Sequence, residues 1–210
     1  MASPLAAPRF DLDGGNPSLD FANTVSDRPT AAPRERLGSY GDLLSWAQQA
    51  GLIDNADARH LLAEAQRRPE EAAAVLRQAR LLREALFRIF SAFAAGKAPS
   101  ERDLHALNAT LPGALAHLRL APATGGLAFS WARDPRALDA MLWPVVRASA
   151  ELLASPDLGA VRECAADTCA WLFLDRSKNQ SRRWCDMKVC GNRSKARRHH
   201  ARKRSAERRR

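Results

Sequence analysis

All four cysteines of this 210-residue chain lie in one basic segment close to its C-terminal end. Their spacing is Cys164-x4-Cys169-x15-Cys185-x4-Cys190. Two close pairs, separated by a loop long enough to turn back, suit the tetrahedral coordination of zinc by four thiolates. Thiolates are soft ligands, and a site with four of them leaves no open position for a substrate. The spacing therefore predicts one structural Zn²⁺, with disulfide or redox pairs and buried free thiols as the alternatives.

The rest of the chain favours metal over disulfides. No apolar run approaches the roughly 18 residues that a membrane-spanning helix needs. The first residues, "MASPLAAPRFDLDGG", lack the basic and apolar regions of a secretory signal. We therefore expect no membrane partner and a cytoplasmic protein, where structural disulfides are rare.

The residues around the cysteines predict a small zinc-dependent module. "AWLFLD" is typical of a strand with Trp171 and Phe173 on one face, and "RRWC" of a second strand returning beside it. Phe173 and Trp184 would then shield the sulfur atoms. After Cys185 the chain reads as a basic helix, with Cys190 in or near its first turn. A hairpin followed by a helix predicts a treble-clef-like zinc finger, whose folding requires the metal because its apolar residues are few.

The preceding residues predict a body that is mainly α with a small β-hairpin. Periodic apolar residues end at Gly or Pro, which are typical helix boundaries. Pro144 should kink or divide the last helix near Trp143. Leu19, Phe21 and Val25 indicate a short buried strand or turn. The expected helices cover residues 42–51, 54–67, 69–96, 100–108 and 135–154, and the expected hairpin covers 117–131. Asp42 is the expected N-cap of the first helix, and Asp54 or Asn55 that of the second.

Charge divides the chain into the same two parts. The net charge is +10, yet residues 162–210 carry 16 Lys and Arg against 5 Asp and Glu. Residues 1–161 carry 17 against 18. A near-neutral body joined to a cationic module indicates a polyanionic partner. A solvated tail that only aids solubility is the alternative.

Two stretches carry a family resemblance. "RRWCDMKVCGNRSKARRH" resembles the CGNR-type zinc finger, and "LDFANTV" with "LLSWAQQAGLI" resembles the ABATE domain that typically precedes that finger. The expected domains are 1–158 for the ABATE-like body, 159–204 for the finger and 205–210 for a frayed basic tail. The resemblance implies a stress-response transcriptional regulator that binds DNA through the finger and a small ligand through the body. It also assigns zinc to the four cysteines.

The basic helix suits double-stranded DNA. A helix fits the major groove, where Arg reads guanine edges and Lys and Arg hold phosphates. The alternatives are that Arg182, Arg183 and Arg193 brace the finger, or that the module binds RNA. We expect base or near-base contacts from Arg193, Arg197 and Arg198. We expect phosphate contacts from Arg182, Arg183 and Lys195. Arg202 adds positive charge.

The body shows no sign of catalysis. The nucleophile-elbow, phosphate-loop, dinucleotide and zinc-protease motifs are absent from the sequence. We therefore predict that the protein is not an enzyme. Asp20, Asn23 and Thr24 are polar residues among apolar ones, and they either satisfy backbone groups or line a ligand pocket.

Together these features predict a DNA-binding transcriptional regulator with a structural four-cysteine zinc finger and a ligand-sensing helical body, located on the nucleoid when bound to DNA. A symmetric DNA site would imply a homodimer, although no heptad marks a dimer helix. An RNA-binding zinc protein and a zinc-stabilised protein-interaction module remain as alternatives, and an enzymatic body is the third.

Overall fold

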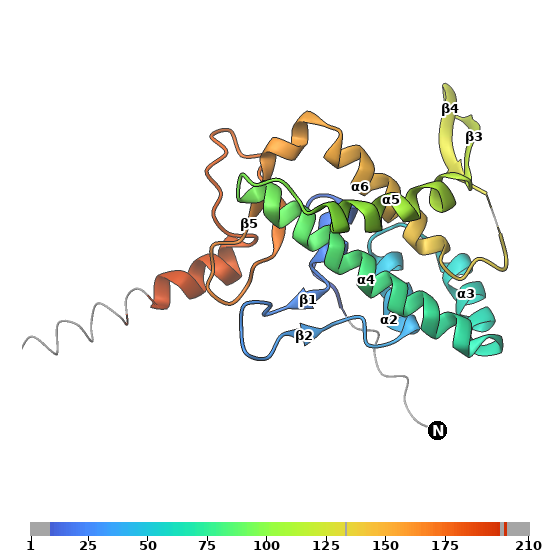
Figure 1. Cartoon of the computed structure of the whole chain (residues 1–210), viewed down its shortest axis with the longest axis horizontal. Helices are drawn as coiled ribbons and strands as arrows, with labels where there is room; N and C mark the ends of the chain where they lie inside the picture. The colour runs from blue at the N-terminus through green and yellow to red at the C-terminus, as the bar shows by residue number, and fades with distance from the viewer. Residues whose placement is uncertain (1–8, 133, 198–199, 201–210) are drawn as a thin grey trace, which may run out of the picture.

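A helical body and a small cysteine-rich finger make up the structure, which is a computed structural model that describes residues 9–132, 134–197 and 200. The longest helix, α4, runs through the middle of the body, and the finger lies at one end of the molecule (Figure 1). The helices are α1 (Pro17–Ala22), α2 (Tyr40–Gln49), α3 (Asn55–Arg67), α4 (Pro69–Ala94), α5 (Glu101–Leu115) and α6 (Trp143–Leu153), with short 3₁₀ turns η1 (Ala140–Leu142) and η2 (Pro156–Ala160).

Local capping decides where the helices begin. The Ser39 hydroxyl accepts the Asp42 N–H, and the Asp42 carboxylate accepts the Ser39 N–H, so α2 opens with a capping box. The prediction of Asp42 itself as the N-cap is therefore wrong by one turn. Asp54 caps α3 as expected. Ser100 caps α5, which extends well beyond the predicted end at residue 108, because Pro112 does not end it.

Two further expectations meet different outcomes in the structure. Pro144 falls in the first turn of α6, where backbone N–H groups have no acceptor within the helix, so the missing N–H of proline costs no hydrogen bond. The predicted division near Trp143 is confirmed. The predicted strand or turn around Leu19 and Phe21 is instead the helix α1. Asn16 caps α1 by accepting the Ser18 N–H, and Pro17 opens it.

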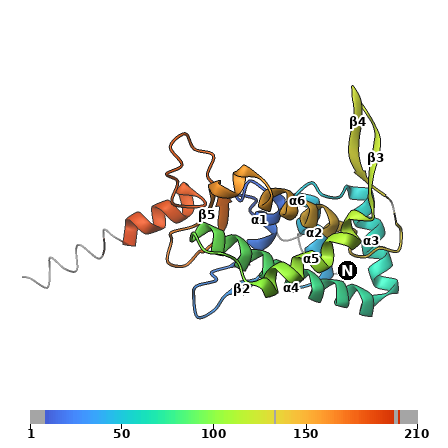
Figure 2. The same ribbon diagram turned by 45° about the horizontal axis from the view of Figure 1, so that its top comes forward.

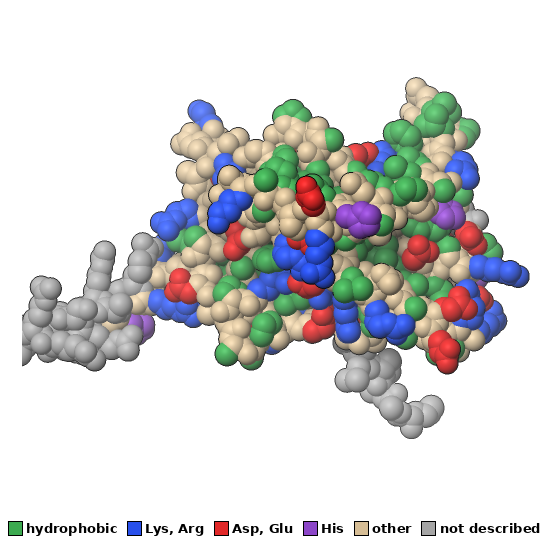
Figure 3. All heavy atoms as spheres, viewed as in Figure 1, with side chains coloured by type: hydrophobic (Ala, Val, Ile, Leu, Met, Phe, Trp, Pro, Cys, Tyr) green, Lys and Arg blue, Asp and Glu red, His purple; other side chains and the backbone are tan. Residues whose placement is uncertain are grey.

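A β-hairpin projects from the body at the end opposite the finger (Figure 1). Its strands, β3 (Leu118–Ala123) and β4 (Gly126–Trp131), confirm the predicted hairpin. One face is apolar throughout, since Leu118, Leu120 and Pro122 pair with Trp131, Phe129 and Leu127. Leu120, Leu127 and Phe129 are 62%, 66% and 59% exposed. Hydrophobic side chains are visible on this projection in Figure 3.

The finger is joined to the body by strands that share its core. Strand β5 (Val161–Glu163) pairs antiparallel with β6 (Leu172–Leu174), and both strands contact α4. Strand β6 also contacts α1. Val161, Leu172 and Leu174 belong to the same hydrophobic core as Phe21, Trp46 and Leu86. Figure 2 shows β5 and α1 close together from a second direction. A short pair, β1 (Val25–Ser26) with β2 (Arg34–Glu35), lies between α1 and α2.

Candidate metal centre and basic helix

The four cysteines come together as their spacing predicted. All are buried, and their Sγ atoms lie within 4.8 Å of one another. The Sγ atoms of Cys169 and Cys185, and those of Cys185 and Cys190, are 3.6 Å apart. Four sulfurs about 2.3 Å from a zinc ion form a tetrahedron with edges of about 3.8 Å. The cluster therefore fits one structural Zn²⁺, which the four thiolates would hold with no open position.

The thiols also show why a cation suits this position. Hydrogen bonds with Cys169 and Cys185 lower the pKa of Cys164, while hydrogen bonds with Cys164 and Cys169, together with burial, raise the pKa of Cys185. One thiolate thus suppresses ionisation of its neighbours, and only a positive ion lets all four ionise together. Phe173 is fully buried beside the sulfurs, with Trp171 and Trp184 packed in the same cluster, so the predicted aromatic shield is present.

Backbone turns deliver the two cysteine pairs to one point. The Cys164 N–H donates to the Trp171 carbonyl (2.8 Å) at the end of the β5–β6 ladder, and the Cys169 N–H donates to Ala166 (2.9 Å). The first pair therefore sits in the tight loop of the hairpin. In the second pair, Cys185 precedes a π-helical turn, η3 (Met187–Gly191), and Cys190 lies within it. Asp186 caps this turn by accepting the Lys188 N–H (2.6 Å). Residues 192–197 continue η3 as an α-helix, so Cys190 lies in the first turn, as predicted.

The predicted return strand at residues 182–185 is wrong. Strand β6 pairs with β5, and the returning segment forms one backbone bond to the first pair's loop, from Ala165 N–H to the Arg183 carbonyl (2.9 Å). Asp175 holds this segment in a loop instead, since its carboxylate accepts the N–H groups of Ser177 (3.0 Å) and Arg182 (2.8 Å). The hairpin-plus-helix architecture stands, with a different strand in the hairpin.

Asn23 joins the finger to the body. Its Oδ1 accepts the Leu172 N–H (2.8 Å), and its Nδ2 donates to the Leu172 carbonyl (2.8 Å), across 149 residues of sequence. The Trp171 indole donates to the Val25 carbonyl (3.0 Å), and Leu174 N–H donates to the Gly14 carbonyl (2.9 Å). These bonds tie the segments before and after α1 to β6.

The other two residues of the proposed ligand set are also bonded within the protein. Thr24 is 2% exposed and donates its hydroxyl to the Phe21 carbonyl (2.7 Å). Asp20 is 8% exposed and accepts the Gly14 N–H (2.8 Å). These bonds and those of Asn23 favour the role of satisfying backbone groups, which the sequence left open beside a ligand pocket. Binding of a small ligand by these three residues stays a prediction.

Asp20 makes stability depend on pH. Burial raises its pKa to about 6, against about 3.9 in an unfolded chain. The folded state therefore holds the proton more tightly, so this carboxyl lowers stability as pH rises from about 4 through about 6, and the loss then levels off because the group is ionised in both states. We expect the free energy of unfolding of Asp20→Asn, relative to wild type, to increase by about 1–2 kcal/mol between pH 5 and pH 8. Urea unfolding of both proteins at a series of pH values measures this difference, and a constant difference would contradict it.

Among the expected DNA contacts, Arg182 has a bracing position. Its Nε donates to the Trp184 carbonyl (2.9 Å), it also donates to the Cys185 carbonyl, and its guanidinium lies 4.4 Å from the Phe173 ring centre. Arg183 lies over the Trp184 ring at 5.4 Å and is exposed. The bracing role is therefore favoured for Arg182.

The remaining expected contacts lie on the helix. Arg193 donates to the Thr168 hydroxyl (3.2 Å), and Arg197 pairs with Asp167 (3.3 Å), so both lie beside the first cysteine pair. Lys195 is exposed. Arg198 and Arg202 lie outside the described residues. The structure thus brings at least two of the expected arginines to the zinc-anchored end of the helix.

Comparison with known families agrees with this architecture. The sequence profile of the ABATE family, described as "Putative stress-induced transcription regulator", matches residues 15–156. The chain belongs to the ABATE family. The profile of the CGNR zinc finger matches residues 160–203 of this family member. No curated protein is significantly similar to the chain. Among the described residues, the helices are too short or too polar to cross a membrane.

For this ABATE family member, the comparison and the geometry lead to the same coarse statement. The chain is a zinc-binding protein of the transcription-regulator type, with one structural Zn²⁺ held by Cys164, Cys169, Cys185 and Cys190. The two matched families are regulators and zinc fingers rather than enzyme families.

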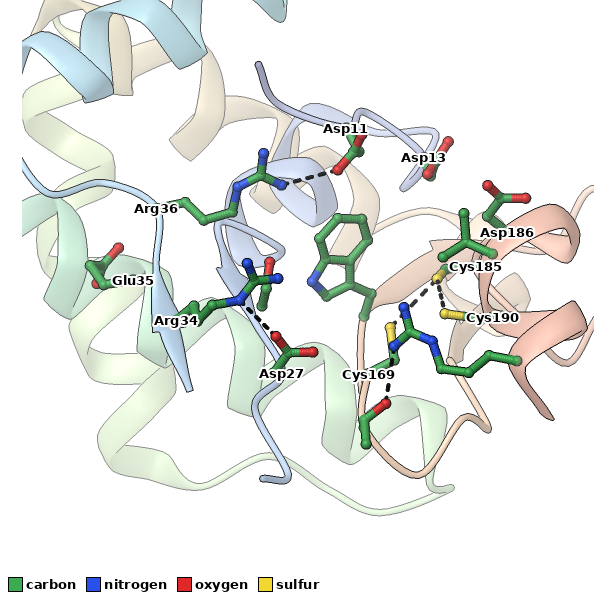
Figure 4. Close-up of a pocket in the computed structure, with 15 residues that line it drawn as sticks. Asp11, Asp13, Asp27, Arg34, Glu35, Arg36, Cys169, Cys185, Asp186 and Cys190 are labelled. Carbon is green, nitrogen blue, oxygen red and sulfur yellow. Dashed lines mark hydrogen bonds and ion pairs between the residues drawn. The ribbon is translucent and has the colours of Figure 1, made fainter. Parts of the chain in front are cut away.

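Sequence reasoning missed two features of this ABATE protein. One is the pair Arg176 and Lys178, which are exposed on the loop after β6 and add charge to the finger, with Arg176 3.7 Å from the Asp157 carboxylate. Both residues were included in the count of Lys and Arg over residues 162–210, which was the available sequence signal. The other is a cleft of about 420 Å³ between finger and body, which Trp171, Arg34 and Arg193 help to line (Figure 4). Its walls come from segments more than 100 residues apart in the sequence, so no local pattern reveals it.

Proposed function

We propose that the chain is a DNA-binding transcriptional regulator whose finger presents its basic helix to double-stranded DNA. The observation that carries the proposal is the helix itself. Cys190 anchors its first turn in the metal centre, and Lys188, Arg193, Lys195 and Arg197 are exposed along it. A cationic helix that is held at one end by a metal ion is well suited to bind a polyanion. Because the metal already fixes its orientation, binding costs less conformational entropy.

The contacts divide by their position in the finger. Arg193 and Arg197 would read base edges, because arginine binds the guanine edge through two hydrogen bonds. Their contacts with Thr168 and Asp167 are exposed and long, so DNA can replace them. Lys195 and Arg183 would hold phosphates, whereas Arg182 would keep Trp184 and Cys185 in place. Arg198 and Arg202 would extend the charged surface.

Selection from a randomised duplex pool tests the proposal. Zinc-loaded protein should enrich a sequence motif, and the enrichment should disappear when zinc is chelated. Single-stranded RNA is the competitor in a parallel series. Tight binding without sequence preference, or stronger competition by RNA, would overturn sequence reading of duplex DNA and would favour the RNA-binding or protein-interaction alternative.

Lys195 supplies a prediction about charge. We expect Lys195→Gln to weaken binding to all duplexes alike and to reduce the slope of log K against log salt by about 1, because one phosphate contact releases about 0.9 counterion. Fluorescence anisotropy across a salt series measures the slope. Arg59→Gln, an exposed change on α3, is the matched control. An unchanged slope in Lys195→Gln would place Lys195 outside the interface.

The body completes the proposal as the part that senses a small effector, and we place the regulator in the cytoplasm, on the nucleoid when bound to DNA. A homodimer would suit a symmetric operator. The apolar face of the β3–β4 hairpin supports this assembly, since its large apolar side chains are exposed to solvent, with the Arg147 guanidinium 4.1 Å from the Phe129 ring centre.

The hairpin gives the dimer a direct test. We expect the double change Leu127→Ser and Phe129→Ser to convert a dimer into a monomer, because it removes two large, exposed apolar side chains of β4 from the contact. Light scattering over a concentration series measures the mass. Leu81→Ser removes an equally exposed leucine from α4 and should leave the mass unchanged. A wild-type protein that remains monomeric throughout contradicts the assembly.

A further inference from the structure

A second cleft lies at the far end of the body from the finger. It has a volume of about 670 Å³ and is formed by the α2–α3 connection, α3, the end of β4 and the segment leading into α6. We call it the α3–β4 cleft; Leu52, Asp57, His60, Trp131, Asp134 and Trp143 line it. Figure 1 and Figure 2 both place α3 and β4 away from the finger. Its size falls within the range of about 300–1,000 Å³ that is usual for small-molecule sites.

Aromatic rings form part of the wall. The Trp131 and Trp143 rings are 6.1 Å apart between centroids and inclined by 47°. Trp143 is held in place, because its indole N–H donates to Asp139 (3.1 Å) and the His117 ring stacks on it at 3.7 Å. Trp143 is 3% exposed and supports Trp131 from behind, so the half-buried Trp131 is the indole that offers a surface to a ligand. An indole binds a flat ring, and it also attracts a cation through the negative face of its π system.

The charged groups of the cleft have one sign. Asp57 and Asp134 contribute carboxylates, and none of the described lining residues is Lys or Arg. His60 is occupied by a hydrogen-bond-length contact with the Pro135 carbonyl (3.1 Å). Apart from Ser130, the other described lining residues, including Leu52, Ile53 and Leu61, are apolar. Carboxylates beside indole rings favour an organic cation over an organic anion, because both attract positive charge.

We propose that the α3–β4 cleft binds a small aromatic or heteroaromatic amine in its ammonium form. The ring lies against Trp131, which Trp143 supports from behind, and the ammonium group faces Asp57 and Asp134. This inference rests on the proposed function in one respect, since it locates the effector site of the body. It places that site away from Asp20, Asn23 and Thr24, whose side chains hold the protein's own backbone.

The test uses three probes with one ring system and full-length, zinc-loaded protein. They are 1-naphthylmethylammonium, the neutral 1-naphthalenemethanol and the anion 1-naphthoate. Calorimetry should show that the ammonium binds at least tenfold more tightly than the naphthoate, with the alcohol between them. Titration followed by NMR should move the Trp131 indole N–H and leave that of Trp184 in the finger unchanged. Equal affinity for cation and anion, or a shift confined to the finger, would overturn the proposal.

Two variants locate the binding. Ala56→Trp fills the cleft from an exposed position on α3, so the fold is preserved, and it should weaken the ammonium at least tenfold. Asp57→Asn should reduce the preference for ammonium over alcohol while retaining affinity for the ring. Glu101→Gln, which removes an exposed carboxylate on α5 that lines neither cleft, is the control for nonspecific attraction. Unchanged binding in Ala56→Trp would reject the site. DNA selection is measured separately, so failure of the cleft and failure of DNA binding are distinguishable.

Discussion

Cys185→Ser is expected to lose the bound zinc and all sequence-specific binding to DNA. The variant leaves three thiolates and a hydroxyl that does not ionise at neutral pH, so the tetrahedral site is no longer complete. Cys185 Sγ lies 3.6 Å from the Sγ atoms of both Cys169 and Cys190, which makes it the link between the two cysteine pairs. Metal binding contributes about 10–16 kcal/mol to the folding of zinc-finger peptides, so this is the largest effect of a single substitution that we expect.

The effect should extend beyond the finger. Residues of β6 alternate between two cores, with Trp171 and Phe173 facing the cysteines and Leu172 and Leu174 facing the helical body. Release of the metal therefore loosens a strand that the body also uses. We expect the unfolding temperature of the whole chain to fall in Cys185→Ser and, to the same degree, in wild-type protein treated with a chelator.

Three measurements check this result. Atomic emission gives zinc per chain, calorimetry gives the unfolding temperature, and anisotropy gives affinity for a selected duplex. Ser181→Ala, an exposed change in the adjoining loop, is the matched control and should behave as wild type. A Cys185→Ser protein with one zinc per chain and unchanged stability would show that this thiol is not a ligand. A zinc-free protein that still reads the motif would separate DNA binding from the metal.

Asn23→Ala should lower the free energy of unfolding by about 2–6 kcal/mol. Asn23 is 3% exposed, and its amide satisfies both the N–H and the carbonyl of Leu172. An unsatisfied buried polar group costs about 1–3 kcal/mol, and alanine leaves two of them. Leu172 lies in β6, which directly follows the loop that carries Cys164 and Cys169. We therefore also expect Asn23→Ala to weaken zinc affinity, measured by competition with a chelator.

A second variant, Asn23→Asp, tests the bond between the Asn23 Nδ2 and the Leu172 carbonyl. Asn23→Asp keeps an acceptor for the Leu172 N–H but places a carboxylate beside the Leu172 carbonyl, so it should be about as destabilising as Asn23→Ala or more so. Asn108→Ala, an exposed asparagine on α5, is the control and should change stability by a few tenths of a kcal/mol at most. Stability in Asn23→Ala equal to that of the control would reject the link between body and finger.

Local patterns predicted much of this molecule. Pro69 and Gly96 enclose α4, Asp54 caps α3, and the cysteine spacing identifies the metal centre, because each of these signals acts within a few residues. Where competing local signals were close together, the predictions were less accurate. Ser39 caps α2 and Asp42 completes its box, whereas the sequence pattern indicated Asp42 alone.

Features that depend on distant residues were not predictable. The β5–β6 pairing was missed because residues 182–185 have equal strand character, and the Asp175 loop is what removes them from the ladder. The partner of Asn23 lies 149 residues away. The α3–β4 cleft combines Leu52 and Trp131, which no periodicity connects.

The finger's place at one end of the molecule has a consequence for how the protein meets its target. Residues 162–210 carry a net charge of +11, whereas residues 1–161 carry −1. The chain is thus an electric dipole, and the field of a polyanion turns it finger-first during diffusion. Added salt should slow association more than it speeds dissociation. In the proposed complex with DNA, the opposite end, which carries the α3–β4 cleft and the hairpin, would face solvent, so a small molecule or a second copy could reach it there (Figure 1).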